Sequence, residues 1–158
     1  MAIHLLRHAE AGSRPSWHQP DDLRPLTSNG VVQSVNVADA LAGLPITRIL
    51  SSRYVRCVQT VQPLADSVGL AVESHTALAE EADVASAWAL LEEVAAAGGT
   101  GDTVLCSHGN VIGALLDRMR RRGITLVADE LSCRKGSVWT VNVADGDVAD
   151  AVLTLAHG

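Results

Sequence analysis

Short apolar runs alternate with amphipathic stretches along most of the chain. The apolar runs at residues 2–6, 46–50, 70–73 and 103–106 predict short, buried strands. Between and after them, apolar residues recur at helical spacing over residues 27–44, 54–68, 84–97 and 110–122, which predicts four helices, the first capped by Thr27. Residues 136–156 alternate apolar and polar positions on both sides of Asp145-Gly146, a pattern typical of a β-hairpin.

This order of elements predicts an α/β fold. Strands that alternate with helices form mostly parallel sheets with helices on both faces. We therefore expect one domain over residues 1–158, with three α/β/α layers and the antiparallel C-terminal hairpin at an edge of the sheet. Pro63 is expected to kink or shorten the second helix. The proline-rich residues 9–25 are expected to form a loop without regular structure that serves as a substrate-binding flap.

Composition and charge narrow the function. The hydrophobic fraction of 47% is typical of a globular protein, and no apolar run reaches the ~18 residues of a membrane span. A formal net charge of −6 argues against broad binding to nucleic acid or to membrane surfaces, so any cationic site is local. We expect a cytoplasmic protein, because the only early apolar run stops at Arg7 and does not resemble a leader peptide.

The cysteines point to neither a disulfide framework nor a metal centre. Cys57, Cys106 and Cys133 are far apart and form no CxxC pair, which favours reduced thiols. A cysteine phosphatase is excluded as well, because its CX5R loop would need an arginine where Pro63 stands. The sequence therefore predicts no metal site and no other cofactor.

Three predicted strands end in residues that suit a phosphate. Arg7 and His8 follow the first strand, Ser52 and Arg56 the second, and His108, Gly109 and Asn110 the fourth. A neutral imidazole can act as a nucleophile, and a guanidinium can bind two phosphoryl oxygens. Because the carboxyl ends of parallel strands line one crevice, we expect two histidines and two arginines to meet there.

Taken together, these motifs resemble the histidine phosphatase superfamily, the phosphoglycerate-mutase-like enzymes. The family's three motifs match Arg-His-Ala at residues 7–9, Ser52 with Arg56 and Thr60, and Ser-His-Gly at residues 107–109, in order over nearly the whole chain. The short length and the Arg-Pro-Leu-Thr stretch at residues 24–27 look like the SixA-type branch. They look equally like the phosphatase domain behind the Nudix domain of some actinobacterial hydrolases, although no Nudix box is present here.

The resemblance implies a metal-independent phosphatase. His8 would attack phosphorus and form a phosphohistidine that water hydrolyses, while Arg7, Arg56 and His108 neutralise the phosphoryl oxygens. The substrate would be a phosphorylated small molecule, such as a nucleotide or a sugar phosphate, or a phosphoprotein. The resemblance to SixA-type enzymes implies protein phosphohistidine as one such substrate. The alternatives are a binding module for phosphorylated ligands without turnover and, less favoured, a mutase, which must shield its intermediate from water.

The remaining candidate residues rest on looser patterns. The family places an acid in a Leu-x-Glu context after the third strand, which Glu80 matches as donor of a proton to the leaving group. Glu81 is the alternative, and some SixA-type members use no such acid. Further phosphate or substrate contacts are expected from Arg24, Ser52, Gly109, Asn110 and Trp17, although a loop tryptophan more often packs on its own domain.

Overall fold

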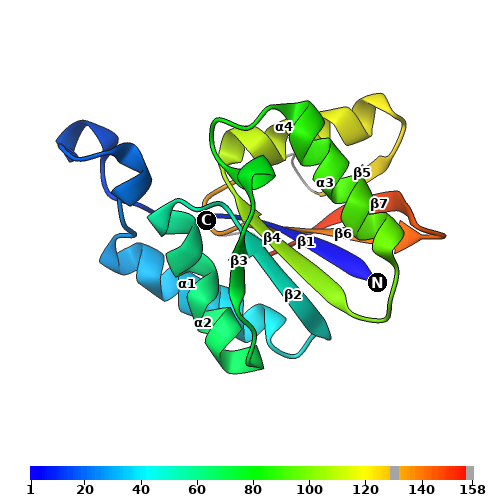
Figure 1. Ribbon diagram of the computed structural model, residues 1–158, viewed down its shortest axis with the longest axis horizontal. Coiled ribbons are helices and arrows are strands. Elements are labelled where there is room, and N and C mark those ends of the chain that lie inside the picture. Colours follow the sequence, from blue (N-terminus) through cyan, green and yellow to red (C-terminus); the bar gives the residue numbers. More distant parts are fainter. Residues whose placement is uncertain (129–131, 156–158) are drawn as a thin grey trace.

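A seven-stranded sheet divides the molecule into two helical layers (Figure 1). The computed structural model describes residues 1–128 and 132–155. The strands are β1 (Ala2–Arg7), β2 (Ile46–Ser51), β3 (Val72–Ser74), β4 (Asp102–Ser107), β5 (Thr125–Val127), β6 (Val138–Ala144) and β7 (Asp147–Leu155). The helices are α1 (Ser28–Leu41), α2 (Val55–Val68), α3 (Val84–Ala97) and α4 (Gly109–Arg121).

The strand order is β3-β2-β4-β1-β6-β7-β5. β1 to β4 run parallel to one another, whereas β6 pairs antiparallel with both β1 and β7. The α/β class, the mostly parallel sheet and the C-terminal hairpin are thus confirmed. The hairpin does not form the edge itself, because β5 pairs in parallel with the outer side of β7. β5 was missed in the sequence because three residues are too few to show an alternating pattern.

Two apolar cores flank the sheet and hold the strand ends in place. One lies under α1 and α2 and includes Val37, Val61 and Leu64, and the other lies under α3 and α4 and includes Trp88 and Ile112. The central strands β1 and β4 contribute side chains to both cores. Each fully buried aliphatic side chain contributes about 1.5–3 kcal/mol, so the ends of these two strands are fixed relative to each other.

Two helices differ from the sequence expectation. Thr27 caps α1 as predicted, since its hydroxyl accepts a hydrogen bond from the Gly30 N–H at 3.0 Å, but the helix ends at Leu41 rather than near residue 44. Pro63 neither breaks nor shortens α2, which continues to Val68. Val61 and Leu64, on either side of the proline, are fully buried against the sheet, and this packing outweighs one lost backbone hydrogen bond.

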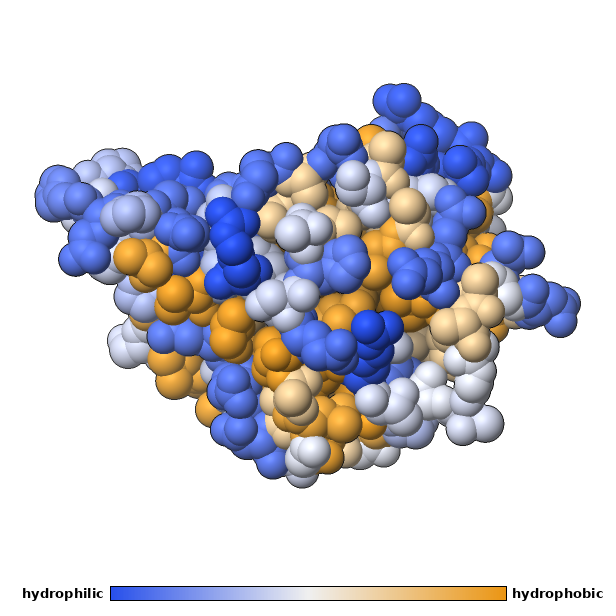
Figure 2. Space-filling view, in the orientation of Figure 1, coloured by the Kyte–Doolittle hydropathy of each residue, from blue (hydrophilic) through white to orange (hydrophobic). Residues whose placement is uncertain are grey.

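The loop over residues 9–25 contains two single turns of 3-10 helix, Arg14–Ser16 and Asp21–Leu23, which the sequence analysis did not expect. Pro15 lies inside the first turn and Pro20 immediately precedes the second, where a missing backbone N–H costs little. The loop projects from the body of the molecule, and its surface is mainly hydrophilic (Figures 1 and 2). Among the described residues, no helix combines the length and apolar character needed to cross a membrane.

Candidate active site

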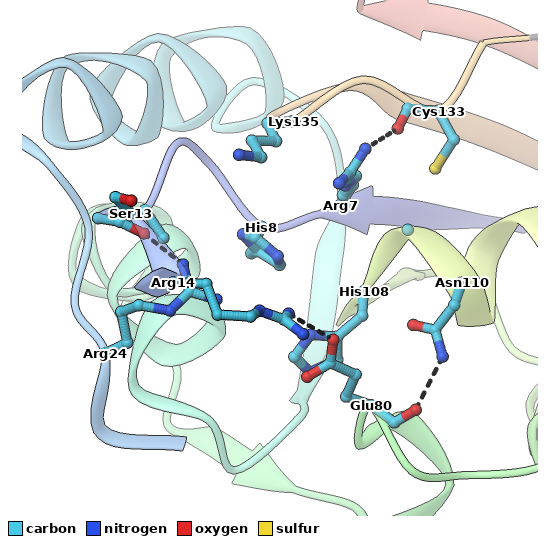
Figure 3. A pocket seen from close by; sticks show the side chains of 13 residues that line it. Arg7, His8, Ser13, Arg14, Arg24, Glu80, His108, Asn110, Cys133 and Lys135 are labelled. Carbon is cyan, nitrogen blue, oxygen red and sulfur yellow. Dashed lines mark hydrogen bonds and ion pairs between the residues drawn. The ribbon is translucent and has the colours of Figure 1, made fainter. Parts of the chain in front are cut away.

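The carboxyl ends of β1 and β4 open into a cavity of about 550 Å³ (Figure 3). Seven of the predicted site residues line it: Arg7, His8, Arg24, Glu80, His108, Gly109 and Asn110. Arg56 and Ser52 are fully buried behind this wall, and Trp17 lies outside it. Residues of the first and third motifs therefore line the cavity together, whereas Ser52 and Arg56 of the second motif lie buried behind its wall.

His8 presents a free ring nitrogen to the cavity. It follows β1, and its backbone N–H donates to the Ser107 carbonyl at 3.0 Å, which joins it to β4. Its Nδ1 lies 2.8 Å from the Ala9 carbonyl oxygen. A carbonyl can only accept, so Nδ1 carries the proton and Nε2 keeps its lone pair. Nε2 is thus the nitrogen available for nucleophilic attack.

The surroundings of His8 keep the ring neutral. Burial is the main cause, and the charges of His108, Arg56 and Arg7 add to it against the opposing hydrogen bond to Ala9, so that the pKa of His8 falls from 6.5 to about 3. The neighbouring positive charges disfavour protonation of His8, but desolvation of the ring contributes more. The nucleophile is therefore unprotonated near neutral pH.

Arg7 is held between a loop and the start of α4. Its Nη1 donates to the Cys133 carbonyl at 2.6 Å. A Cβ atom on Gly109 would lie 2.7 Å from Cζ of Arg7, so the guanidinium can occupy this place only because residue 109 has no side chain. The Nε of Arg7 is buried and has no partner.

His108 is oriented by Ser52. The Ser52 hydroxyl lies 2.9 Å from Nε2 of His108 and also accepts the Tyr54 N–H at 3.3 Å. The Cys57 thiol is 3.6 Å from the same nitrogen. The opposite nitrogen, Nδ1, is buried without a partner, and the His8 and His108 ring centroids are 5.4 Å apart. Ser52 thus positions His108 rather than lining the cavity, where the sequence analysis expected a substrate contact.

Arg56 is fully buried and is fixed by two carboxylates. Its Nη1 donates to the Asp21 carbonyl at 2.9 Å, and its Nη2 donates to Oδ2 of Asp21 at 3.1 Å and to Oε2 of Glu80 at 2.9 Å. Only Nε has no partner. Asp21 was not predicted from the sequence. An acid three residues before Arg24 in a polar loop was a usable signal, because Asp21 also accepts from Nε of Arg24 at 3.0 Å.

Glu80 and Glu81 occupy different environments. Glu80 lines the cavity, where Oε1 accepts from Arg14 at 3.0 Å and Oε2 accepts from Arg56 at 2.9 Å. Glu81 does not line the cavity and accepts from Arg53 at 2.6 Å and from the Tyr54 hydroxyl at 2.8 Å. Its own backbone N–H and these two donors lower the pKa of Glu81 to about 2. Of the two acids, only Glu80 lies where a leaving group can reach it.

The other predicted contacts fall into two groups. Arg24 and Asn110 line the cavity, but the Arg24 guanidinium is bound to Asp21 and to the Gly12 carbonyl, and the Asn110 amide donates to the Glu80 carbonyl at 2.8 Å. Trp17 donates its indole N–H to the Pro20 carbonyl within its own loop. Arg24 and Asn110 therefore shape the cavity wall, and Trp17 packs on its own loop.

The unsatisfied donors gather around His8. Among the described residues, the buried side-chain nitrogens without a hydrogen-bond partner are Nε of Arg7, Nε of Arg56, Nδ1 of His108 and Nε1 of Trp88. Buried polar groups are nearly always paired, so each exception requires an explanation. The first three belong to predicted catalytic residues. The positive charges of Arg7, Arg56 and His108 all lower the pKa of His8.

The chain is similar in sequence to known phosphatases. Residues 3–84 match the family model of the histidine phosphatase superfamily (branch 1). Over 150 residues the chain is 31% identical to the 8-oxo-(d)GTP phosphatase of Mycolicibacterium smegmatis, a match that covers 93% of this chain and 46% of that protein. The chain spans less than half of the length of the curated relatives that it matches.

Solved structures share the whole fold. The protein histidine phosphatase SixA complexed with tungstate superposes with a TM-score of 0.76 at 22% identity, over 98% of this chain and 95% of that one. A mycobacterial glucosyl-3-phosphoglycerate phosphatase complexed with VO3 gives 0.74 at 17% identity, over 98% of each chain. At these identities the likeness establishes the α/β architecture.

Proposed function

The chain belongs to the histidine phosphatase superfamily, and from that premise we propose that it is a metal-independent phosphatase that works through a phosphohistidine on His8. The observation that carries the proposal is that Arg7, Arg56 and His108, whose charges act on the neutral ring of His8, each keep one buried nitrogen without a hydrogen-bond partner. Both solved relatives described above were crystallised with oxyanions, tungstate and VO3, which have the charge and approximate shape of a phosphoryl group.

The reaction has two steps. In the first, the lone pair on Nε2 of His8 forms a bond to phosphorus while the bond to the leaving group breaks and its electron pair departs with that group. In the second, water attacks the phosphohistidine, the N–P bond breaks, and its electron pair returns to Nε2. Nε of Arg7, Nε of Arg56 and Nδ1 of His108 donate to the equatorial oxygens, whose charge is spread in the transition state.

The backbone adds to this stabilisation. His108 is the N-cap of α4, and Gly109 is its first residue, so the unpaired N–H groups and the positive end of the helix dipole lie beside the cavity. Glu80 is the proposed proton donor to leaving groups that need one, because it lines the cavity and Glu81 does not. The neutral form would have to compete with the hydrogen bonds that Arg14 and Arg56 donate to Glu80.

No metal ion is required by this scheme, because two guanidiniums and a second histidine supply the positive charge. The described residues contain no group of three or more histidine, cysteine or acidic side chains placed to hold a metal. Activity should therefore survive exhaustive chelation. A loss that one divalent metal restores would contradict the proposal.

The proposed substrate is a phosphorylated small molecule or a phosphoprotein. The relatives named above act on different compounds: an oxidised nucleotide, a protein histidine phosphate and a phosphorylated sugar acid. They support phosphoryl transfer as the shared chemistry. A screen of nucleotides, sugar phosphates and a phosphohistidine protein at matched concentration would separate these classes.

The covalent intermediate provides the test. After incubation with an aryl phosphate and rapid alkaline denaturation, intact mass spectrometry should find one added phosphoryl group on the wild-type protein and none on His8→Ala. His18→Ala is the matched control, since His18 is an exposed histidine of the 9–25 loop that does not line the cavity. Turnover by His8→Ala would refute the mechanism. Phosphate binding by the wild type without turnover or intermediate would establish the binding-module alternative instead.

A further inference from the structure

Lys135 lines the cavity and, within residues 1–128 and 132–155, has no anionic partner. It is the only lysine in the chain, it is exposed, and it lines the same cavity as His8. Arg14 and Arg24 are held there by the carboxylates of Glu80 and Asp21. No salt bridge or hydrogen bond to the Lys135 ammonium occurs among the described residues. In Figure 3, Lys135 and Arg14 lie on opposite sides of His8.

The backbone around Lys135 is fixed next to the nucleophile. The Gly136 N–H donates to the Arg7 carbonyl at 3.0 Å and to the His8 carbonyl at 3.1 Å, and the Arg7 N–H donates to the Ser137 carbonyl at 3.1 Å. Gly136 has φ of 77°, which a residue with a side chain rarely adopts. This turn therefore presents the lysine beside the end of β1, whatever rotamer its side chain takes.

The acid whose charge interacts with Lys135 is already satisfied. The pKa of Glu10 is lowered mainly by hydrogen bonds from Asn29 and Thr27, and the charge of Lys135 adds only the smallest contribution. One oxygen of Glu10 accepts from the Thr27 hydroxyl at 2.8 Å, and the other accepts from the Asn29 amide at 3.0 Å. Within the part of the chain that the structure describes, the ammonium of Lys135 is thus left to solvent, or to a ligand that enters the cavity.

The cavity is larger than one phosphoryl group requires. Its volume of about 550 Å³ falls in the range of pockets that enclose drug-sized ligands. Three unpartnered nitrogens already serve the phosphoryl group next to His8. A further cation on the wall, Lys135, is therefore available to another part of a bound molecule.

We propose that Lys135 is a specificity residue, which binds a second anionic group carried by the leaving part of the substrate. This inference rests on the proposed function, because it takes the first anionic group to be the phosphoryl group that His8 receives. The second group is a phosphate or a carboxylate. A compact ammonium with three donors binds either one as a point charge. Substrates with a neutral leaving part lack this contact and bind more weakly.

Three small phosphonates that cannot be hydrolysed test the proposal by calorimetry at fixed ionic strength. Methylphosphonate has one anionic group, phosphonoacetate adds a carboxylate, and methylenebisphosphonate adds a second phosphonate. The wild type should bind at least one of the last two roughly tenfold more tightly than methylphosphonate, the factor of a charge-assisted contact worth about 1.4 kcal/mol. The probe that binds more tightly than methylphosphonate identifies the second group as a carboxylate or a phosphate.

Lys135→Met should reduce that ratio to near unity. Arg48→Met is the matched control, because it removes one exposed positive charge on β2, whose partner is Glu73, outside the cavity. Since Lys135 is the only lysine, amine-reactive labelling read by peptide mass spectrometry gives a second measurement: the preferred phosphonate should protect it. Equal binding of all three probes, or a ratio unchanged in Lys135→Met, would overturn the proposal. Because binding is measured without turnover, this result is independent of whether a phosphohistidine forms on His8.

Discussion

Gly109 offers a way to displace Arg7, a proposed catalytic residue, without removing it. It is the first residue of α4, and its side-chain position is filled by the guanidinium of Arg7. In Gly109→Ala the new Cβ would lie 2.7 Å from Cζ and 2.9 Å from Nε of Arg7. Ordinary contact begins near 3.4 Å, so the guanidinium must retreat by at least about 0.7 Å. The flexible arginine moves more readily than the helix, and it leaves its contact with the Cys133 carbonyl.

The expected loss follows from that displacement. A misplacement of about 1 Å in a catalytic group can cost roughly 10²-fold in rate. Removal of one donor to a developing oxyanion costs about 10²–10³-fold. We therefore expect kcat/KM of Gly109→Ala for an aryl phosphate to fall about 10²-fold. Stability should change by less than about 1 kcal/mol, because alanine is the better helix former.

A double-mutant cycle with Arg7→Ala tests whether Gly109→Ala acts by displacing Arg7. If Gly109→Ala acts through Arg7, it should cost little in a protein that already lacks the guanidinium, so the two effects should be strongly non-additive. Gly113→Ala on the same helix is the control, because a Cβ there meets nothing within 4 Å and should leave kcat/KM unchanged. Additive losses in the cycle, or full activity of Gly109→Ala, would refute the placement of Arg7 in the site.

Three further predictions address other groups in the site. Because burial lowers the pKa of His8 from 6.5 to about 3, its NMR titration should show a neutral ring above about pH 4. The contribution of His8 to the free energy of unfolding is then complete above pH 6.5 and is lost as the pH falls toward 3. An NMR titration midpoint near pH 6.5 would contradict the burial argument. Ser52→Ala should leave Nε2 of His108 without its hydroxyl partner, lower kcat about tenfold and destabilise the fold by about 1–3 kcal/mol, as measured by urea unfolding and by a changed ¹⁵N shift of that ring. Glu80→Gln should slow an alkyl phosphate by about 10²–10⁴-fold and a phosphoramidate much less, with Glu81→Gln as comparison; equal effects on both substrates would remove Glu80 as the acid.

Much of the site could be predicted because its chemistry lies where strands end. His8 and His108 follow buried apolar runs, and a polar residue at such a place is informative when the strands are parallel. The sequence also indicated Arg56, because the spacing from Ser52 matches one family motif. These residues are fixed by local order along the chain together with one topological rule.

The residues that the sequence did not reveal depend on distances across the fold. Asp21 gains its role only when the loop brings it to Arg56, which is 35 positions away. Ser52 was identified but given the wrong partner, because its hydroxyl points to His108 on a different strand end. The 3-residue strand β5 is paired by β7 and has too little pattern of its own. Long-range pairing of this kind leaves no periodic signal in the chain.

The contacts of the loop over residues 9–25 favour a fixed wall over the flap expected of it. A flap must open, but this loop supplies Asp21 as acceptor for two nitrogens of the fully buried Arg56, and Arg14 as a donor to Glu80. Opening would remove the Asp21 carbonyl from Nη1 of the buried Arg56, at a cost of about 1–3 kcal/mol, whereas Nη2 would keep Glu80. The same contacts leave Nε as the one unpartnered nitrogen of Arg56. We therefore expect the loop to act as a fixed wall that orients the arginine before substrate arrives, and such preorganised donors cost no rearrangement in the transition state.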